Sequence, residues 1–582
     1  MKRWLQYVKP YKAYFILGPL CMIIEVIGEV VMPIFLGNII NDGINGDLTP
    51  AKCVGYAFLM ILTALIMMAG GVGGAYFGSK ASVNYAADVR RDVYKKIQKF
   101  SFANIDKFST GSLVTRLTND VTQIQMFVNT LLRMCLRSPG MLIGALIMAI
   151  SLSPSLSLVL AVTIPVMALT ISFIISKGFP RFAVMQNKVD ALNSTIQESV
   201  TNVRVVKSFV REDYEIEKFV DANADLKKTG ISAMKVMILT GPFMTMFMNI
   251  TVAVVVWIGA QLVMGNTTTP MDVGHLSQFI TYVNQILMSL MMLTMMFTMS
   301  SRALASVKRI SEVLDEKIDI IDNFEANDDY VVNNGEIEFK DVTFRYYKNS
   351  EDSVLDKINL KIPAGSVVGI IGSTGCGKTT LVSLIPRLYD TDSGEVLVDG
   401  INVKDYKLEK LRDGVGMVLQ KNILFSGTIE DNLRWGDAKA TDDEVISAAS
   451  SSQAHSFIST FADGYKTELE QGGVNVSGGQ KQRLCIARAL LKKPKILILD
   501  DSTSAVDTAT EAKIREEFKT SLKDSTKIII AQRITSVMDA DMIVVMNDGK
   551  ITGVGTHEEL MNSNQEYKEI YTSQTDSKEK EA

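Results

Sequence analysis

Six long apolar stretches occupy the first half of the chain, and they constrain its fold more than any other feature. Each approaches or exceeds the roughly 20 residues that an α-helix needs to cross a bilayer. They lie near residues 14–38, 53–77, 138–155, 157–176, 239–264 and 274–299. The sequence therefore predicts six transmembrane helices in a lipid bilayer. The first apolar run is too long for a cleavable signal peptide.

The distribution of Lys and Arg predicts which side of the membrane each loop occupies. Segments 80–137 and 177–235 contain ten Lys or Arg each, whereas 41–52 contains one and 265–272 contains none. Positively charged loops stay on the cytoplasmic side. Both long segments and both termini are therefore predicted to be cytoplasmic. The long segments keep apolar residues at helical spacing, which predicts that they extend the membrane helices into the cytoplasm.

The composition excludes several classes of protein. At 47% hydrophobic and 21% charged residues, the chain of 582 residues is too apolar to be mainly disordered. Its net charge of −4 gives no electrostatic basis for binding nucleic acid. The five cysteines are scattered, without the paired spacing of a zinc site or a disulfide framework.

The second half of the chain has a different pattern. Residues 1–314 are predicted to form the transmembrane domain with its helical extensions, followed by an acidic linker at 315–334. From 335 to 574 short apolar runs alternate with polar helical segments, which is typical of an α/β domain. The polar and charged residues 575–582 are predicted to be a disordered tail.

A phosphate-binding loop is predicted at the start of this α/β domain. The sequence GSTGCGKT at 372–379 follows a strand-like run and precedes a predicted helix, as a P-loop requires. Backbone N–H groups of such a loop surround phosphates at a helix N-terminus. Lys378 is expected to reach the β- and γ-phosphates of ATP, and the Thr379 hydroxyl to ligate Mg²⁺. The predicted nucleotide-binding residues here are Gly372, Ser373, Thr374, Gly375, Cys376, Gly377, Lys378, Thr379 and Thr380.

Two further motifs follow in a set order. The apolar run 496–499 ends in Asp500, placed as a Walker-B carboxylate that holds the metal. Between the two Walker motifs, Ser477, Gly478, Gly479 and Gln480 are similar to the LSGGQ signature of ATP-binding cassette (ABC) proteins. With six membrane helices and one nucleotide-binding domain, nearly the whole chain resembles a half-transporter of the ABC exporter family.

This resemblance assigns roles to further residues. It implies that Tyr346 stacks on adenine, that Gln420 meets Mg²⁺, and that the signature completes the site of a second subunit. Segments 108–120 and 203–209 resemble the two cytoplasmic loops that dock on nucleotide-binding domains. The fold expected is therefore a membrane α-helical domain joined to a cytoplasmic α/β P-loop ATPase domain.

Two residues depart from the family pattern, both in the hydrolysis site. The residue after the Walker-B aspartate is normally a glutamate that polarises water, and here it is Asp501. Its carboxylate is retracted by roughly 1.5 Å, one carbon–carbon bond. The switch histidine is replaced by Gln532, which can donate a hydrogen bond but cannot become cationic. We expect a weakened catalytic site, and hence a heterodimer whose partner carries the stronger one; a homodimer with two slow sites is the alternative.

Two glutamates lie inside the first predicted membrane span. Glu25 and Glu29 are four residues apart and so share a helix face. Ionisable residues in a membrane are costly and indicate function, so they could receive a cationic amphiphile or carry protons. The alternative is a structural role beside a water-filled cavity, or pairing with a cation of the partner. Methionines of the last span, including Met291 and Met295, are candidates for a substrate surface that adapts to several ligands.

The resemblance implies an ATP-driven exporter in a bacterial plasma membrane. Drugs or lipid-like amphiphiles are the expected cargo. Two alternatives remain, namely a peptide exporter of the same fold and a nucleotide-binding regulatory subunit with little pumping of its own.

Overall fold

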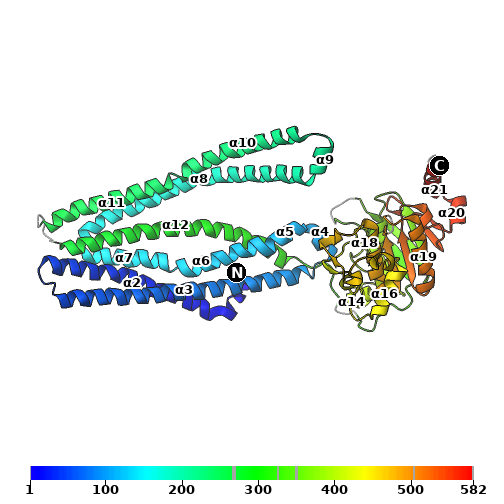
Figure 1. The fold of residues 1–582 in the computed structure, drawn as a ribbon, viewed down its shortest axis with the longest axis horizontal. Coiled ribbons are helices and arrows are strands. Elements are labelled where there is room, and N and C mark those ends of the chain that lie inside the picture. Colours follow the sequence, from blue (N-terminus) through cyan, green and yellow to red (C-terminus); the bar gives the residue numbers. More distant parts are fainter. Residues whose placement is uncertain (1, 265–270, 324–326, 348–351, 503–504, 580–582) are drawn as a thin grey trace. The chain divides into compact units, whose positions relative to one another are not determined.

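The computed structural model divides the chain into two compact units (Figure 1). The helical unit comprises Met1–Gln98 and Gly111–Asp315, and the α/β unit comprises Lys99–Thr110 and Glu316–Ala582. The structure describes residues 2–264, 271–323, 327–347, 352–502 and 505–579.

Six helical segments of the helical unit are long and apolar enough to cross a membrane, which confirms the six predicted spans. The elements of this unit are α1 (Lys2–Gln6), η1 (Lys9–Tyr11), α2 (Lys12–Ile44), α3 (Pro50–Ile97), α5 (Thr110–Thr115), η2 (Arg116–Asp120), α6 (Val121–Met134), α7 (Arg137–Leu152), α8 (Pro154–Thr201), α9 (Val203–Ser208), α10 (Glu212–Met237), α11 (Thr240–Val263) and α12 (Val273–Asp315).

The helices are much longer than their apolar stretches. Helices α3 and α8 have 48 residues each, or about 72 Å at 1.5 Å per residue, against about 30 Å of hydrocarbon. Between α7 and α8 the chain turns at Ser153, whose side chain caps α8 by accepting a hydrogen bond from the Leu156 amide. Pro154 is the first residue of α8, a position that needs no amide donor.

Two sets of helices pack within this unit. Helix α2 packs along α3, and α12 packs against α7, α2 and α6. Small residues permit the close α2–α3 approach, since a Cβ at Gly70 would lie 2.8 Å from the carbonyl oxygen of Cys21. The second set is an arm in which α8 pairs with α10 and α11, with α9 at its tip (Figure 1).

The α/β unit contains short helices and three sheets. Its elements are α4 (Phe102–Lys107), β1 (Ile337–Phe344), β2 (Leu355–Ile362), β3 (Val367–Gly372), α13 (Lys378–Ser383), β4 (Ser393–Val398), β5 (Ile401–Asn402), α14 (Leu408–Asp413), β6 (Val415–Val418), β7 (Gly427–Thr428), α15 (Ile429–Leu433), α16 (Asp442–Ser451), α17 (His455–Ile458), η3 (Gly464–Lys466), β8 (Glu468–Leu469), η4 (Gln471–Gly473), α18 (Gly478–Leu491), β9 (Ile496–Asp500), α19 (Thr508–Ser521), β10 (Thr526–Ile530), η5 (Ile534–Ser536), β11 (Met542–Asn547), β12 (Lys550–Gly555), α20 (His557–Ser563) and α21 (Gln565–Glu579).

The largest sheet positions the predicted motifs. Its strand order is β12-β11-β3-β10-β9-β6, with β10 parallel to both β3 and β9. Every residue of β9 and β10 is buried, as expected for the Val/Ile/Leu-rich strands of a sheet covered on both faces. The carboxyl ends of parallel strands meet at one edge, so the loop after β3 lies close to Asp500 at the end of β9.

The unit boundaries differ from the predicted ones at three places. Residues 99–110, assigned to the transmembrane domain from sequence, belong to the α/β unit. The predicted linker is packed, since Asn327 pairs with Tyr406 and Val332 lies in the core. The predicted tail is partly wrong, because helix α21 continues to Glu579.

Candidate nucleotide site

The loop after β3 has the backbone of a phosphate cradle. Gly375 and Gly377 take φ of +85° and +97°, a left-handed conformation that side chains disfavour. At Gly372 a Cβ would lie 2.1 Å from the Met546 carbonyl oxygen. The Lys378 Nζ donates hydrogen bonds to the carbonyls of Gly372 (2.9 Å) and Ser373 (2.7 Å), so it is already folded over the loop.

The two predicted magnesium ligands contact each other. The Thr379 hydroxyl donates to Oδ1 of Asp500 at 3.0 Å. Asp500 is 1% exposed, and its Oδ2 has no hydrogen-bond partner among the described residues. Burial raises the pKa of the Asp500 carboxyl. A buried carboxylate with a free oxygen beside a hydroxyl is a fitting donor pair for Mg²⁺, which when bound neutralises phosphate charge.

Asp501 and Gln532 also meet. The Gln532 Nε2 donates to Oδ2 of Asp501 at 2.8 Å. Burial raises the pKa of Asp501, while hydrogen bonds from Gln420 and Gln532 act in the opposite direction. The two departures from the family pattern therefore form one interacting pair, with Gln420 beside it.

These residues surround one cavity of about 520 Å³. Of the predicted residues, those lining it are Gly372, Ser373, Thr374, Gly375, Lys378, Thr379, Gln420, Asp500, Asp501 and Gln532. Cys376 is 4% exposed and contacts Lys378 Nζ through its sulfur at 3.7 Å, inside the loop. Gly377 and Thr380 belong to the loop and to α13 but do not line the cavity.

Sequence reasoning missed one wall of the cavity. Helix α21 contributes five of the lining residues, which are Glu566, Glu569, Ile570, Ser573 and Gln574. Gln574 donates from Nε2 to the carbonyl of Gln532 (2.9 Å) and accepts at Oε1 from the amide of Ile534 (2.8 Å). It therefore holds the backbone on both sides of Arg533. No local pattern marks Gln574, because it is one polar residue on a polar helix.

Tyr346 lies beside the loop rather than in this cavity. Its hydroxyl is 2.9 Å from the Thr380 hydroxyl, and its ring meets the rings of Phe344 and Tyr389 edge-on. Tyr346 is 43% exposed, which is compatible with the predicted stacking on adenine.

The signature lies at the start of α18. The Ser477 hydroxyl accepts from the Gln480 amide and the Gln480 side chain accepts from the Ser477 amide, a reciprocal cap. Ser477 and Gly478 are exposed, and none of the four signature residues lines the described cavity. A Cβ at Gly479 would lie 2.8 Å from the Ala505 carbonyl oxygen. The structure thus does not bring the signature to this chain's own P-loop.

A short helix of the first cytoplasmic loop is docked within the α/β unit. Helix α4 immediately precedes segment 108–120, and its Asp106 accepts a 2.8 Å hydrogen bond from the Tyr389 hydroxyl. Lys107 pairs with Glu316 at 2.7 Å. The helix of the second loop, α9, instead leaves apolar side chains exposed, including Val205 at 55%, and Phe209 directly after it is 73% exposed.

The glutamates of the first span share one cation. The Arg137 Nη2 lies 2.6 Å from Glu29 and 3.1 Å from Glu25. The pairing cation is therefore on this chain, rather than on a partner as the structural alternative supposed. Met291 is 42% exposed, and the placement of the Met295 side chain lies outside what the structure describes.

Comparisons with known proteins agree with this arrangement. Residues 15–290 match the family model of the ABC transporter transmembrane region, and residues 355–504 match that of the ABC transporter. The chain is 37% identical to the ABC transporter ATP-binding protein YfiB of Bacillus subtilis, over 99% of this chain and 98% of that protein. It is 33% identical to the putative multidrug export ATP-binding/permease protein YgaD of the same organism, over 99% of each.

A solved structure shares the fold of both units. The chain is similar to a bacterial Atm1-family ABC exporter with ATP bound, with a TM-score of 0.79 and 24% identity. The similarity covers 96% of this chain and 98% of that one.

Proposed function

The chain belongs to the ABC transporter family, and from that premise we propose that it is one half of a heterodimer that exports amphiphilic compounds across the plasma membrane. The observation that supports this most is the contact between Asp501 and Gln532. Asp501, at the position expected to polarise water, has a side chain one methylene shorter than glutamate, and the Gln532 amide donates a hydrogen bond to its carboxylate.

This pair accounts for a slow hydrolysis site. Misplacing a catalytic group by about 1 Å can cost on the order of 100-fold in rate. In place of a histidine, the Gln532 amide offers a donor that carries no charge. We infer that ATP bound by the P-loop of this chain is hydrolysed slowly, with Thr379 and Asp500 holding Mg²⁺ and Tyr346 holding adenine.

The partner's site supplies most of the hydrolysis in this proposal. Ser477, Gly478 and Gly479 would complete it, and the exposure of Ser477 and Gly478 supports this role. The part of the arm that contains α9 and α10 also supports a second subunit. Apolar side chains along it are exposed, including Val200, Phe209 and Val220 at 67%, 73% and 53%. Apolar surface of this extent indicates a protein interface.

The ATPase activity of the chain reconstituted alone tests the weakened site. Wild type should hydrolyse ATP slowly, and the double variant Asp501→Glu with Gln532→His should be faster by about tenfold or more, since it restores the family's groups. Lys378→Ala in the same background is the control and should abolish the gain. A wild-type chain that hydrolyses ATP as fast as the double variant would establish the homodimer instead.

The heterodimer is tested with the half-transporter that co-purifies from native membranes. The pair should hydrolyse ATP robustly, with Asp501→Asn reducing the rate and substitution of the partner's Walker-B glutamate abolishing it. Transport of amphiphilic dyes and of peptides into inverted vesicles then assigns the cargo. An ATPase-active pair that moves neither would contradict the exporter and favour the regulatory subunit.

A further inference from the structure

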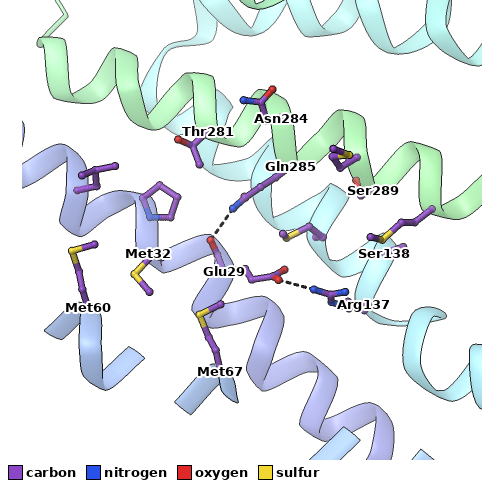
Figure 2. Close-up of a pocket in the computed structure, with 15 residues that line it drawn as sticks. Glu29, Met32, Met60, Met67, Arg137, Ser138, Thr281, Asn284, Gln285 and Ser289 are labelled. Atoms are coloured by element: carbon purple, nitrogen blue, oxygen red, sulfur yellow. Dashed lines mark hydrogen bonds and ion pairs between the residues drawn. The ribbon is translucent and has the colours of Figure 1, made fainter. Parts of the chain in front are cut away.

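A second cavity, of about 480 Å³, lies in the membrane-spanning part of the helical unit (Figure 2). Residues of α2, α3, α7 and α12 line it. Its walls are apolar and rich in thioethers, and the methionines that line it are Met32, Met60, Met67, Met141, Met288 and Met292. Such side chains adapt to apolar bodies of different shape, and this volume suits a small organic molecule.

One side of this cavity is charged. Glu29 and Arg137 line it and contact each other at 2.6 Å (Figure 2). Glu25, which does not line the cavity, lies 3.1 Å from the same guanidinium. Two carboxylates thus share one cation. Arg137 is the one Lys or Arg among the described lining residues, so the ionised cluster carries a formal net charge of −1.

Several oxygens around the cavity lack partners. Oε2 of Glu29 and Oε1 of Gln285 are shielded from solvent and accept no hydrogen bond from any described residue. The Gln285 Nε2 is already used, donating to the Glu29 carbonyl at 2.9 Å. Ser138 is 2% exposed, and its hydroxyl likewise has no partner in the described parts of the chain. Buried acceptors of this kind are costly until a donor reaches them.

We propose that this cavity binds the protonated amine of an amphiphilic cargo, with the side chains of Glu29, Gln285 and Ser138 turning toward the cavity to accept hydrogen bonds from the ammonium N–H groups. The methionine walls receive the apolar body. An anion would face the excess carboxylate, and a neutral apolar compound would leave the acceptors unpaired. A quaternary ammonium would supply the positive charge but has no N–H group to donate to these oxygens. This inference rests on the proposed exporter function, because the amine is a transported substrate only if the chain exports it. Binding of the amine itself requires only this chain.

Equilibrium binding of a dansylated primary alkylamine, dansylcadaverine, to the full chain in nanodiscs tests the inference. Its N-acetyl and N-trimethyl analogues have the same body, without the charge and without the donors respectively. The amine should bind at least about tenfold more tightly than either analogue, as expected for charge-assisted hydrogen bonds. Equal affinity for the amine and the acetylated analogue would overturn the proposal.

Substitutions locate the binding. Glu29→Gln should weaken amine binding by about tenfold and leave the acetylated analogue unaffected. Asp42→Asn is the matched control, because Asp42 is on the same helix but is bound to Lys52 and Tyr56, which do not line the cavity. An equal loss in both variants, or none in Glu29→Gln, would overturn the site.

Met288→Trp provides a second variant that keeps every charge and fills the cavity. It should abolish binding of all three probes, whereas unchanged binding would place the ligand elsewhere. Binding of a fluorescent ATP analogue, retained in each variant, verifies that the chain is folded. If the chain does not bind the amine but its pair still transports, the amine site is refuted and the exporter proposal stands. If the chain binds the amine but its pair transports nothing, the exporter proposal is refuted and the amine site stands.

Discussion

Asp500, the metal ligand in our proposal, is a buried carboxylate with little compensation. It is 1% exposed and only its Oδ1 receives a described hydrogen bond, from Thr379. A pKa raised by burial means that folding disfavours the ionised form. The stability of the folded chain is therefore greater below the ordinary pKa of an aspartate and is reduced as the pH rises through the folded-state value.

Asp500→Asn should accordingly raise the Tm of the nucleotide-free chain at neutral pH, because it removes an uncompensated buried charge. The gain should shrink as the pH falls below the raised pKa, where the wild-type carboxyl is already protonated. Differential scanning fluorimetry at several pH values measures both effects. A gain that is independent of pH would show that burial of the charge is not its cause. The variant should also lose the stabilisation that Mg²⁺ with ATP gives to wild type.

Asp120 shows the opposite case, a buried charge that is well compensated. Its side chain is 3% exposed, and it accepts hydrogen bonds from Ser306 at 2.8 Å and from the Arg309 Nε at 2.8 Å. This cluster joins η2 to α12 in the cytoplasmic extension of the helices.

Arg309→Met should destabilise the chain by about 2 kcal/mol, because it leaves the Asp120 carboxylate buried without its cation. The Tm in detergent measures the loss. Lys308→Met is the matched control, since Lys308 is exposed on the same helix. The double variant with Asp120→Asn should recover much of the loss, and a double variant as unstable as the single one would exclude the buried charge as the cause.

At the scale of elements, α21 is an added wall of the nucleotide cavity. Gln574 holds the Gln532 carbonyl and the Ile534 amide, on either side of Arg533. The segment that carries Gln532 is therefore restrained by the C-terminal helix.

Gln574→Ala should speed hydrogen exchange of the Ile534 amide about fivefold, the equivalent of one hydrogen bond of about 1 kcal/mol. Mass spectrometry of peptides covering 530–537 measures it. Gln565→Ala, which removes only a contact with Glu569 on the same helix, is the control. Equal exchange in the two variants would mean that α21 does not restrain residues 530–537.

At the scale of the whole molecule, the second subunit that we propose would cover the apolar side chains exposed on α9 and at Phe209, directly after it. Val205, Val206 and Phe209 line a groove of about 640 Å³ together with Tyr214. In a monomer this surface would face water.

Phe209→Ala should leave ATP binding unchanged and reduce the cargo-stimulated ATPase activity of the pair by about tenfold, the typical cost of truncating an aromatic residue buried at an interface. Ser208→Ala is the neighbouring control. Unchanged activity in the Phe209 variant would show that this loop does not engage a partner.

Local patterns were sufficient to predict the six spans and the motifs around Lys378, Asp500 and Ser477. A membrane helix is defined by the length of its apolar run, and a P-loop by glycines whose backbone conformation and amides form the cradle. The departures at Asp501 and Gln532 were also visible from sequence alone, because each motif defines which residue to expect at each position.

Only the tertiary structure decided which distant residues meet. The pairing of Arg137 with Glu25 and Glu29, the packing of Gln574 beside Gln532, and the place of residues 99–110 in the α/β unit all depend on contacts between distant parts of the chain. Such contacts leave no periodicity or spacing in the sequence, since any polar residue on the facing turn could make them. The order of the nucleotide-site motifs could therefore be identified from the sequence, whereas the C-terminal wall of the cavity they line and the charged membrane cavity depended on how the helices pack.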